Sequence, residues 1–495
     1  MKILSREKMY WFFTAVAGLS VTALLFFSPA VYGQDMSSFQ EERLLRTFRQ
    51  VFDFVQDNYV EEVDPDVLIE GAMKGMFESL DDPYSAYLDT EDMRSLTDTT
   101  SGEFGGVGLY INKVRPDEDR PQLQEWVEVV SPIEGTPAYR AGMRPRDLII
   151  EIEGESTIEM SIDEVVDRLR GEPGSVVEIT ILRNMKNELN IELERAIIEI
   201  PTVRHAAIDD DIAYLRIIQF TPRTAEKVEE ALRELKESGH REFILDLRTN
   251  PGGLLTSAVD TADLFFDDGL VVGTAGRVAG ENQAFYARQG TVLDDTSKLI
   301  VVINEGTASA AEILAGALRD RDRAVVVGTT SYGKGSVQQV RSLGDGGFRL
   351  TMARYYTPDE TFIDKVGIEP DITVEEPELT EKESEDLITI QQEDRIQEFL
   401  NQAGNNPGEN RIRQFFNGLR NEGFEVNERL VRRLITLELE MRTNESAPYD
   451  LDYDLVLQEA VRILRENETR RIINSREESN SMSSRGNALP EPALQ

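Results

Sequence analysis

The chain has 495 residues, with 53 lysines and arginines against 92 aspartates and glutamates, so its formal net charge is −39. This length exceeds what one hydrophobic core supports, and about two to four domains are expected. A hydrophobic content of 40% excludes wholesale disorder. The negative charge argues against nucleic acid as a partner, because phosphates would be repelled. The absence of cysteine excludes thiol nucleophiles, thiolate metal sites and disulfides.

Metal and cofactor sites are not predicted anywhere in the chain. The two histidines, His205 and His240, lie far apart in sequence and outside any paired-ligand spacing. Both are interpreted as ordinary surface or interface residues. A triad built on histidine therefore has few candidates, although triads are assembled in space and not in sequence.

The N-terminus carries an apolar run over residues 10–27, which follows three basic residues and precedes small residues that permit cleavage before Gln34. The run is about as long as a minimal membrane span. Two interpretations stay open: a signal peptide over residues 1–33, or an anchor in the inner membrane. Both predict an exported protein of the cell envelope or periplasm, whose N-terminus the basic residues keep in the cytoplasm.

Residues 34–101 form a predicted helical region. The segments RLLRTFRQVFDFVQDNYV and DPDVLIEGAMKGMFESL both place apolar residues at helical spacing. An amphipathic arm of this kind packs on the following domain or on a second copy of the chain. A homodimer through the helical regions is therefore one of two open interpretations.

From Gly102 the sequence changes to glycines and alternating β-forming residues. The glycines at 105, 106 and 108 precede a predicted strand, and such a turn leaves successive amides free to bind an anion. The stretch SPIEGTPAYRAGMRPRDLIIEIEG then predicts a strand, a short helix, a glycine cap and a second strand, followed by a helix at 162–169 and a strand at 176–182. In this order, residues 102–195 resemble a PDZ domain.

The PDZ resemblance implies that the glycine loop binds the C-terminal carboxylate of a peptide, which adds a strand to the sheet edge. The alternative is a degenerate PDZ domain that only positions other parts. Arg170, at the end of the helix, is either a helix C-terminal cation or a contact to a neighbouring domain. The residues implied in binding are, for the carboxylate, the amides of Val107, Gly108 and Leu109 and, for the side-chain pocket, Val165, Val166 and Leu169.

Strands and helices alternate after residue 211, which predicts a parallel sheet with helices on its faces. The predicted strands lie at 212–217, 242–248, 299–303 and 324–327. Two strand ends turn into helices through glycine, at TNPGGLL (249–255) and at GTAS (306–309). Backbone amides are free at such turns, and two turns at one sheet edge are a stronger signal than one.

A hydroxyl at a strand-to-helix turn is a good place for a nucleophile, and Ser309 stands there. It precedes a predicted helix whose apolar face is Ile313, Leu314, Ala317 and Leu318. Lys334, in SYGKGS, is the strong base closest in sequence. A neutral lysine can activate a serine, and burial lowers the lysine pKa from about 10.4. Gln338, four residues on, can orient the lysine without restoring its charge.

At these residues the sequence resembles the carboxyl-terminal processing proteases, also called tail-specific proteases. The matching stretches are DLRTNPGGLL, GTASAAEI, SYGKGSVQ, ARYYTPD and GIEPDI. With the PDZ domain inserted ahead of the core, the resemblance covers most of residues 70–375. The resemblance implies a multidomain α/β (α+β) chain. Its protease core, residues 196–375, would have a parallel βαβ sheet of the crotonase and Clp-protease kind.

The family pattern implies a nucleophile at Ser309, a general base at Lys334 and an orienting residue at Gln338. Glu312 also matches the family, and a helix N-cap role is favoured for it over catalysis. The sequence departs from the pattern at Thr307, Ala311 and Glu360, none of which belongs to the dyad. The oxyanion hole would be made by the amide of Ala310 together with that of Gly252 or Gly253.

The predicted function is that of an exported serine endopeptidase that cleaves proteins near their C-termini, without metal or cofactor. The PDZ domain would recognise protein or peptide substrates with free C-termini and gate the site. One alternative is a catalytically silent envelope adaptor, and another is an acyl-CoA-type enzyme, which needs neither the dyad nor the PDZ domain. After the core, an acidic helical region over 376–474 and a disordered end over 475–495 are predicted.

Overall fold

A computed structural model describes residues 30–114, 124–344, 346–443 and 447–486. The apolar run at 10–27, and with it the question of signal or anchor, lies outside these residues. Within the described ranges, no helix is both long enough and apolar enough to cross a membrane. The chain divides into two compact units at residue 89, and each is described by itself.

The first unit contains the helices α2 (Ala30–Asn58) and α3 (Pro65–Glu78) and the short strand β1 (Ala86–Leu88). Asp64 caps α3 by accepting a hydrogen bond from the Asp66 amide, and Pro65 occupies the first helical position. On α2 the side chains of Leu44, Phe48 and Val51 are 64%, 47% and 59% exposed. The helical prediction for this region is confirmed, and the described residues of the unit leave the apolar stripe of α2 exposed.

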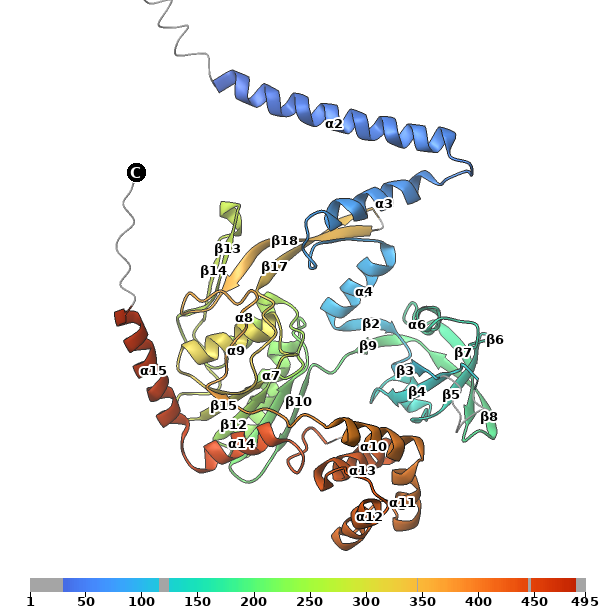
Figure 1. The fold of residues 1–495 in the computed structure, drawn as a ribbon, viewed down its shortest axis with the longest axis vertical. Helices are drawn as coiled ribbons and strands as arrows, with labels where there is room; N and C mark the ends of the chain where they lie inside the picture. The colour runs from blue at the N-terminus through green and yellow to red at the C-terminus, as the bar shows by residue number, and fades with distance from the viewer. Residues whose placement is uncertain (1–29, 115–123, 345, 444–446, 487–495) are drawn as a thin grey trace, which may run out of the picture. The chain divides into compact units, whose positions relative to one another are not determined.

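The second unit begins with α4 (Thr90–Ser101) and β2 (Glu103–Gly106), which pairs antiparallel with β9 (Ala196–Glu199). A small β domain stands between β2 and β9 (Figure 1). Its strands are β3 (Leu109–Lys113), β4 (Val127–Pro132), β5 (Leu148–Ile152), β6 (Glu155–Ser156), β7 (Val176–Arg183) and β8 (Asn187–Glu194), and its helices are α5 (Pro137–Arg140) and α6 (Ile162–Leu169).

A six-stranded sheet forms the centre of the second unit, in the order β10-β11-β12-β15-β16-β19. Every neighbouring pair is parallel except β10 and β11. Its four inner strands are short, apolar and buried on both faces, as a parallel sheet requires, whereas the two edge strands are only partly buried. The strands are β10 (Val203–Ala207), β11 (Ile212–Ile217), β12 (Glu242–Asp246), β15 (Lys298–Ile303), β16 (Val325–Gly328) and β19 (Ile372–Thr373).

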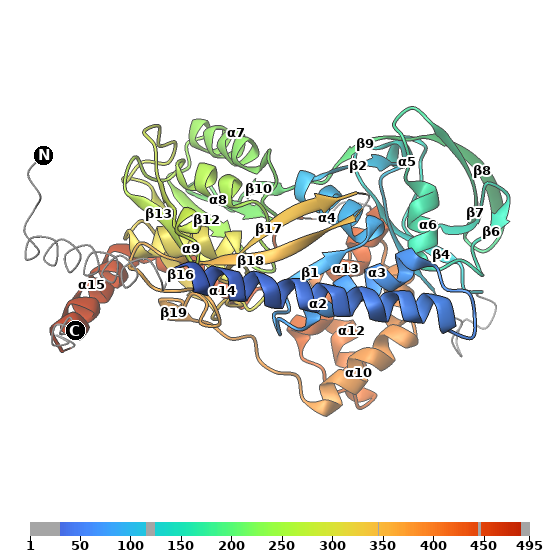
Figure 2. The same ribbon diagram turned by 90° about the horizontal axis from the view of Figure 1, so that it is seen from above.

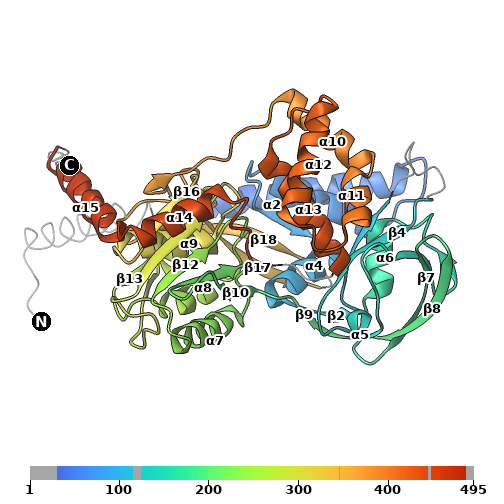
Figure 3. The ribbon, with the colours of Figure 1, turned by 90° about the horizontal axis from the view of Figure 1, so that it is seen from below.

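The two faces of this sheet are covered by different parts of the chain. One face packs against α7 (Thr224–Glu237), α8 (Leu255–Ala262) and α9 (Ala310–Asp320). The other packs against α14 (Leu455–Arg465), which lies across the strands (Figure 3). Alternate residues of each strand serve the two cores, as Leu299 and Ile300 on β15 do. The predicted parallel sheet with helices on its faces is therefore confirmed.

A second sheet lies beside the first. Its long strands β17 (Ser336–Leu343) and β18 (Gly346–Tyr356) form an antiparallel hairpin (Figure 2). β18 also pairs with β13 (Leu270–Gly276), which pairs with β14 (Ala284–Tyr286), and the short helix η1 (Ala279–Glu281) joins the last two strands.

The acidic region after residue 375 divides into two structural parts. Four helices pack around a core of their own, including Leu400, Phe416 and Val431. They are α10 (Glu381–Gln392), α11 (Arg395–Ala403), α12 (Glu409–Asn421) and α13 (Glu428–Thr443). The next helix, α14, instead joins the central sheet. The last helix of the described residues, α15 (Thr469–Gly486), continues past Ser475, although disorder is predicted from that residue onward.

Candidate active site

Two strand-to-helix turns meet at one edge of the central sheet. β12 and β15 are parallel neighbours, so the loops that follow them leave the sheet side by side. The Ala308 amide donates to the Asn250 carbonyl at 2.9 Å, and the Thr249 amide donates to Asn304 Oδ1 at 2.8 Å. The Thr307 hydroxyl donates to the Leu247 carbonyl at 2.8 Å. These three bonds hold the loop at 247–253 against the loop at 304–309.

Ser309 lies where the second of these loops enters α9. Its backbone has φ 56° and ψ −118°, a conformation that costs free energy for a residue with a side chain. The residue is only 9% exposed. Surrounding contacts hold the backbone in this strained conformation, which places the Ser309 hydroxyl at the N-terminal end of α9.

Gly252 packs directly against Ser309. A Cβ added to Gly252 would lie 2.8 Å from Ser309 Cβ and 2.9 Å from the Ala310 amide nitrogen, so only glycine fits. The Gly252 amide donates to Asn250 Oδ1 at 2.9 Å. Among the described residues, neither the Gly253 amide nor the Ala310 amide donates to a protein acceptor. These two amides are thus the donors that an oxyanion hole would use.

Glu312 joins the serine turn to the lysine turn. Its carboxylate is fully buried and accepts four hydrogen bonds. One oxygen accepts from the Ser309 amide at 2.7 Å and the Lys334 amide at 2.9 Å. The other accepts from the Ser331 hydroxyl at 2.6 Å and the Gly333 amide at 2.7 Å. The expected N-cap role is therefore present, but it is one of four interactions.

Lys334 and Gln338 follow the buried strand β16, on the segment that leads into β17. Lys334 is half-buried. Burial and the nearby charge of Arg349 lower the pKa of its ammonium group, against the opposing charge of Glu312. Gln338 is on β17, where its amide nitrogen donates to the Ser336 hydroxyl at 2.7 Å. The backbone amides of Ser309 and Lys334 thus share one oxygen of the Glu312 carboxylate, whereas the Gln338 side chain bonds to Ser336.

Several residues of this site carry no motif that sequence reasoning could single out. The Asn304 side chain bonds to Thr249 across the two loops, and the Asn250 side chain donates to the Ile217 carbonyl of β11 at 2.9 Å. The Ser331 hydroxyl also accepts from the Ile368 amide at 2.7 Å. Each is a small polar residue in a turn, which in sequence signals only the turn. Their partners are far away in the chain.

The glycine loop of the small β domain has the geometry of an anion-binding turn. The amides of Val107 and Gly108 donate to no protein acceptor within the described part of the chain. Gly108 has φ +82°, and a Cβ there would lie 2.3 Å from Thr136. Leu109 begins β3 and pairs with Pro132.

The helix α6 of the same domain divides its apolar residues between core and surface. Val165 and Leu169 are buried in the domain core, whereas Val166 is only half-buried. Of the three predicted pocket residues, Val166 is thus the one with exposed side-chain surface. Arg170 forms an ion pair with Asp98 of α4 at 2.7 Å and lies over the ring of Phe104, so it contacts a neighbouring element.

The histidines have structural partners. His240, expected to be an ordinary surface or interface residue, is buried, and its ring nitrogens each lie 3.0 Å from a backbone carbonyl oxygen, of Leu235 and of Asp209. The ring thus lies between the end of α7 and the residues that precede β11. His205 lies 3.3 Å from the carboxylate of Glu234.

Comparison with known proteins gives three family matches. Residues 211–374 match peptidase family S41, residues 128–183 match a PDZ domain, and residues 27–92 match the N-terminal domain of the activating protease CtpB. The PDZ match confirms the prediction for the small β domain.

Individual relatives agree with these matches. The chain is 39% identical over 377 residues to a carboxy-terminal-processing protease of Bartonella bacilliformis, an alignment that covers 75% of this chain and 83% of the relative. It is 34% identical over 366 residues to the carboxy-terminal processing protease CtpA of Bacillus subtilis, covering 74% and 76%. A solved photosystem II D1 C-terminal processing protease is 30% identical, with a TM-score of 0.40, and covers 66% of this chain and 86% of that one. The family match and the identity to the Bartonella and Bacillus relatives show that the chain is a serine peptidase of family S41 and belongs to the carboxy-terminal processing proteases.

Proposed function

We propose that this chain is an exported endopeptidase that cleaves proteins near their C-termini with a dyad of Ser309 and Lys334. The observation that carries the proposal is the Glu312 carboxylate. One of its oxygens accepts from the backbone amides of both dyad residues, so these amides lie no farther apart than the sum of 2.7 Å and 2.9 Å. A strained serine, a lysine of lowered pKa and unoccupied amides then meet at one sheet edge.

The chemistry follows from these groups. Neutral Lys334 takes the proton of the Ser309 hydroxyl as its oxygen attacks the scissile carbonyl. The amides of Ala310 and Gly253 donate to the oxygen of the tetrahedral intermediate. The leaving amine receives the proton from Lys334, and water then hydrolyses the acyl-enzyme by the same route. Gln338, on β17 beside Ser336, is the proposed orienting residue for the lysine.

Recognition of a free C-terminus is proposed for the PDZ domain. The free amides of Val107 and Gly108 would hold the terminal carboxylate, and the peptide would pair with β3 beside α6. Val166 supplies exposed apolar surface on α6, while Val165 and Leu169 support it from the core. Binding there would admit the chain to Ser309.

Export and self-association complete the proposal. Residues 1–33 would direct the chain to the cell envelope, either as a cleaved signal or as an inner-membrane anchor. Helix α2 would pair with α2 of a second copy, because Leu44, Phe48, Val51 and Val55 repeat at the alternating spacing of four and three residues that forms a helix-pairing seam.

The test uses the purified chain and a peptide ending in apolar residues, offered with a free carboxylate and as the C-terminal amide. We expect cleavage of both peptides, with a higher KM for the amide, because it lacks the charge that the PDZ loop binds. Ser309→Ala and Lys334→Ala should each reduce kcat to background while the melting temperature stays near that of the wild type.

The outcomes separate the proposals. Undiminished cleavage by either variant would overturn the dyad, and equal KM values for the two peptides would overturn PDZ recognition of the carboxylate. Binding of the free-carboxylate peptide without any cleavage by the wild type would indicate a silent adaptor. Mass spectrometry of envelope-protein C-termini in cells with wild-type protein or Ser309→Ala would identify the substrates.

A further inference from the structure

A series of buried polar groups stands at the end of β12, where the loop toward Gly253 begins. Asp246 is fully buried and accepts a hydrogen bond from the Tyr214 hydroxyl at 2.8 Å. Arg248 donates to the same carboxylate at 2.6 Å. Burial alone would raise the pKa of Asp246, but the charge and hydrogen bonds of Arg248 outweigh it, so the pKa is lowered and the group is a carboxylate.

The other edge of Arg248 is bound by a residue from outside the family match. Nη1 and Nη2 donate to the two oxygens of Asp454 at 2.8 Å and 2.5 Å, a bidentate pair. The side chains of Arg248 and Asp454 are 19% and 14% exposed, so solvent screens this pair only weakly. Asp454 lies in the C-terminal helical region, beyond residues 211–374.

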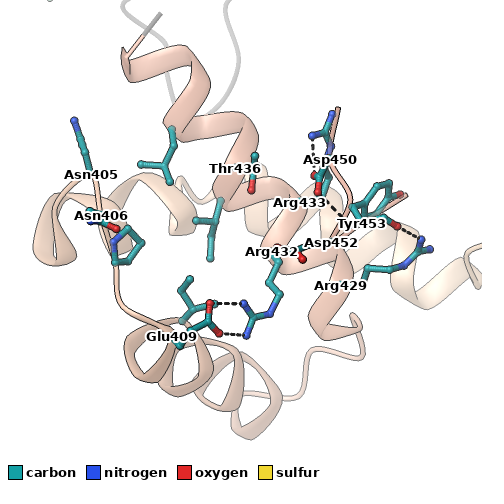
Figure 4. Close-up of a pocket in the computed structure, with 14 residues that line it drawn as sticks. Asn405, Asn406, Glu409, Arg429, Arg432, Arg433, Thr436, Asp450, Asp452 and Tyr453 are labelled. Atoms are coloured by element: carbon teal, nitrogen blue, oxygen red, sulfur yellow. Dashed lines mark hydrogen bonds and ion pairs between the residues drawn. The ribbon is translucent and has the colours of Figure 1, made fainter. Parts of the chain in front are cut away.

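Asp454 is itself held from two directions. It caps α14 by accepting from the Leu457 amide at 2.9 Å, and α14 is packed on the central sheet. The segment before Asp454 is bound to α13 by an ion pair and a hydrogen bond, at the rim of a cavity of about 210 Å³ (Figure 4). There Arg433 pairs with Asp450 at 3.0 Å, and Arg429 donates to the Tyr453 carbonyl at 2.7 Å.

Arg248 directly precedes the loop that presents the Gly253 amide. The next residue, Thr249, has φ 57°, a left-handed conformation that a non-glycine residue adopts only when its neighbours hold it. Gly253 follows four residues later. A shift of Arg248 would therefore be passed directly to Thr249 and along this short turn to the Gly253 amide.

We infer that Asp454 is a positioning residue for catalysis: through Arg248 it fixes the 249–253 loop and so the Gly253 amide at the Ser309 site. The inference rests on the proposed function of that site. It gives the C-terminal helical region a part in the reaction, in addition to its packing on the sheet.

The test separates positioning from stability. Asp454→Asn keeps an oxygen that can cap α14, because asparagine is as good an N-cap as aspartate, but it removes the charge that pairs with Arg248. The apolar contacts of α14 with the sheet remain. We expect kcat to fall about tenfold or more, short of the ~10²–10³-fold loss when an oxyanion donor itself is removed. KM and the melting temperature should stay near the wild-type values.

A matched control is Asp386→Asn, which removes the ion pair with Lys382 in the same helical region; the Asp386 side chain is 5% exposed, and none of its partners is Arg248 or Asp454. It should leave kcat unchanged. A second control is a double-mutant cycle with Arg248→Lys, in which the effect of Asp454→Asn on kcat should shrink.

The results have distinct meanings. If wild-type protein cleaves and Asp454→Asn cleaves equally fast, the inference is wrong and the dyad stands. The inference is also wrong if kcat and melting temperature fall together in both aspartate variants, since that pattern reports stability. A wild-type chain that cleaves no peptide contradicts the proposed function itself.

Discussion

One carboxylate brings the candidate catalytic residues together. Glu312 accepts from Ser309 and Lys334 on one oxygen and from Ser331 and Gly333 on the other. Burial raises the pKa of Glu312, although all four hydrogen bonds favour its charged form. Burial and the charge of Arg349 lower the pKa of Lys334, and together they outweigh the Glu312 charge, which raises it.

The pH dependence of cleavage should report this balance. The dyad needs neutral Lys334, so kcat/KM should rise with pH through the lysine pKa, and this rise should lie below the usual range for lysine. Arg349→Gln removes a charge that lowers the pKa, so it should move the rise to higher pH. Hydrolysis rates of one peptide across a pH series measure both effects.

Arg341→Gln is the control for the pH experiment. Arg341 is on the same hairpin, but it is exposed and hydrogen-bonds to Gln339, so its loss should leave the profile in place. Identical profiles for Arg349→Gln and the wild type would show that Arg349 does not act on the base.

Among the loops between elements, the turns at Gly252 and Gly239 both require a positive φ but differ in what surrounds the glycine. Gly252 has φ +99°, and its α-carbon faces Ser309 with no room for a side chain. Gly239, after α7, has φ +104°, but a methyl group added there would have no neighbour within 4 Å, so it meets only the conformational requirement. Substitutions at the two glycines therefore distinguish the cost of a strained backbone from the effect of crowding Ser309.

Alanine at these two positions should give different results. Each variant should lose about 1–2 kcal/mol of unfolding free energy, because a residue with a Cβ is forced into a left-handed conformation. Only Gly252→Ala should also lose cleavage, since its methyl group would displace Ser309 or the Ala310 amide. Urea unfolding and peptide hydrolysis measure the two effects. Equal retention of activity would contradict the packing of Gly252 on the serine.

Elements were predictable where the pattern was local. The short apolar runs of β11 and β15, and the helical spacing in α9, depend only on nearby residues, and these elements formed as expected. Ser309 and Lys334 were found because each stands in a distinctive turn. Glu312 was recognised only as a cap, since its bonds to Ser331 and Gly333 cross a strand and a loop.

Contacts between residues far apart in the chain could not be predicted from the sequence. An apolar helix face predicts burial but not which residues face the core, so Val165 and Val166 could not be told apart. The acidic composition of residues 376–474 predicts helices but not that α14 and the start of α15 pack on the central sheet. Likewise, Asp454 is one acidic residue among many until the fold places it against Arg248.

At the scale of the whole molecule, the exposed seam of α2 should decide the oligomeric state. Apolar side chains that repeat along a helix and lie open to solvent are unfavourable unless another surface covers them. The chain from residue 34 onward should sediment as a dimer, and Leu44→Glu with Phe48→Glu should convert it to a monomer. Gln50→Glu adds a charge off the seam and should leave the dimer intact. A monomeric wild type would contradict the proposed pairing.

The packing of α14 on the sheet has a consequence for how the enzyme is made. The sheet strands span residues 203–373, but the helix that covers their second face ends only at Arg465. A chain still emerging from a ribosome or a translocation channel therefore has an open apolar face and lacks Asp454 until nearly all of it has appeared. Under the proposed export, peptidase activity would then arise late in biosynthesis, after the chain has passed the compartment in which unscheduled cleavage would do harm.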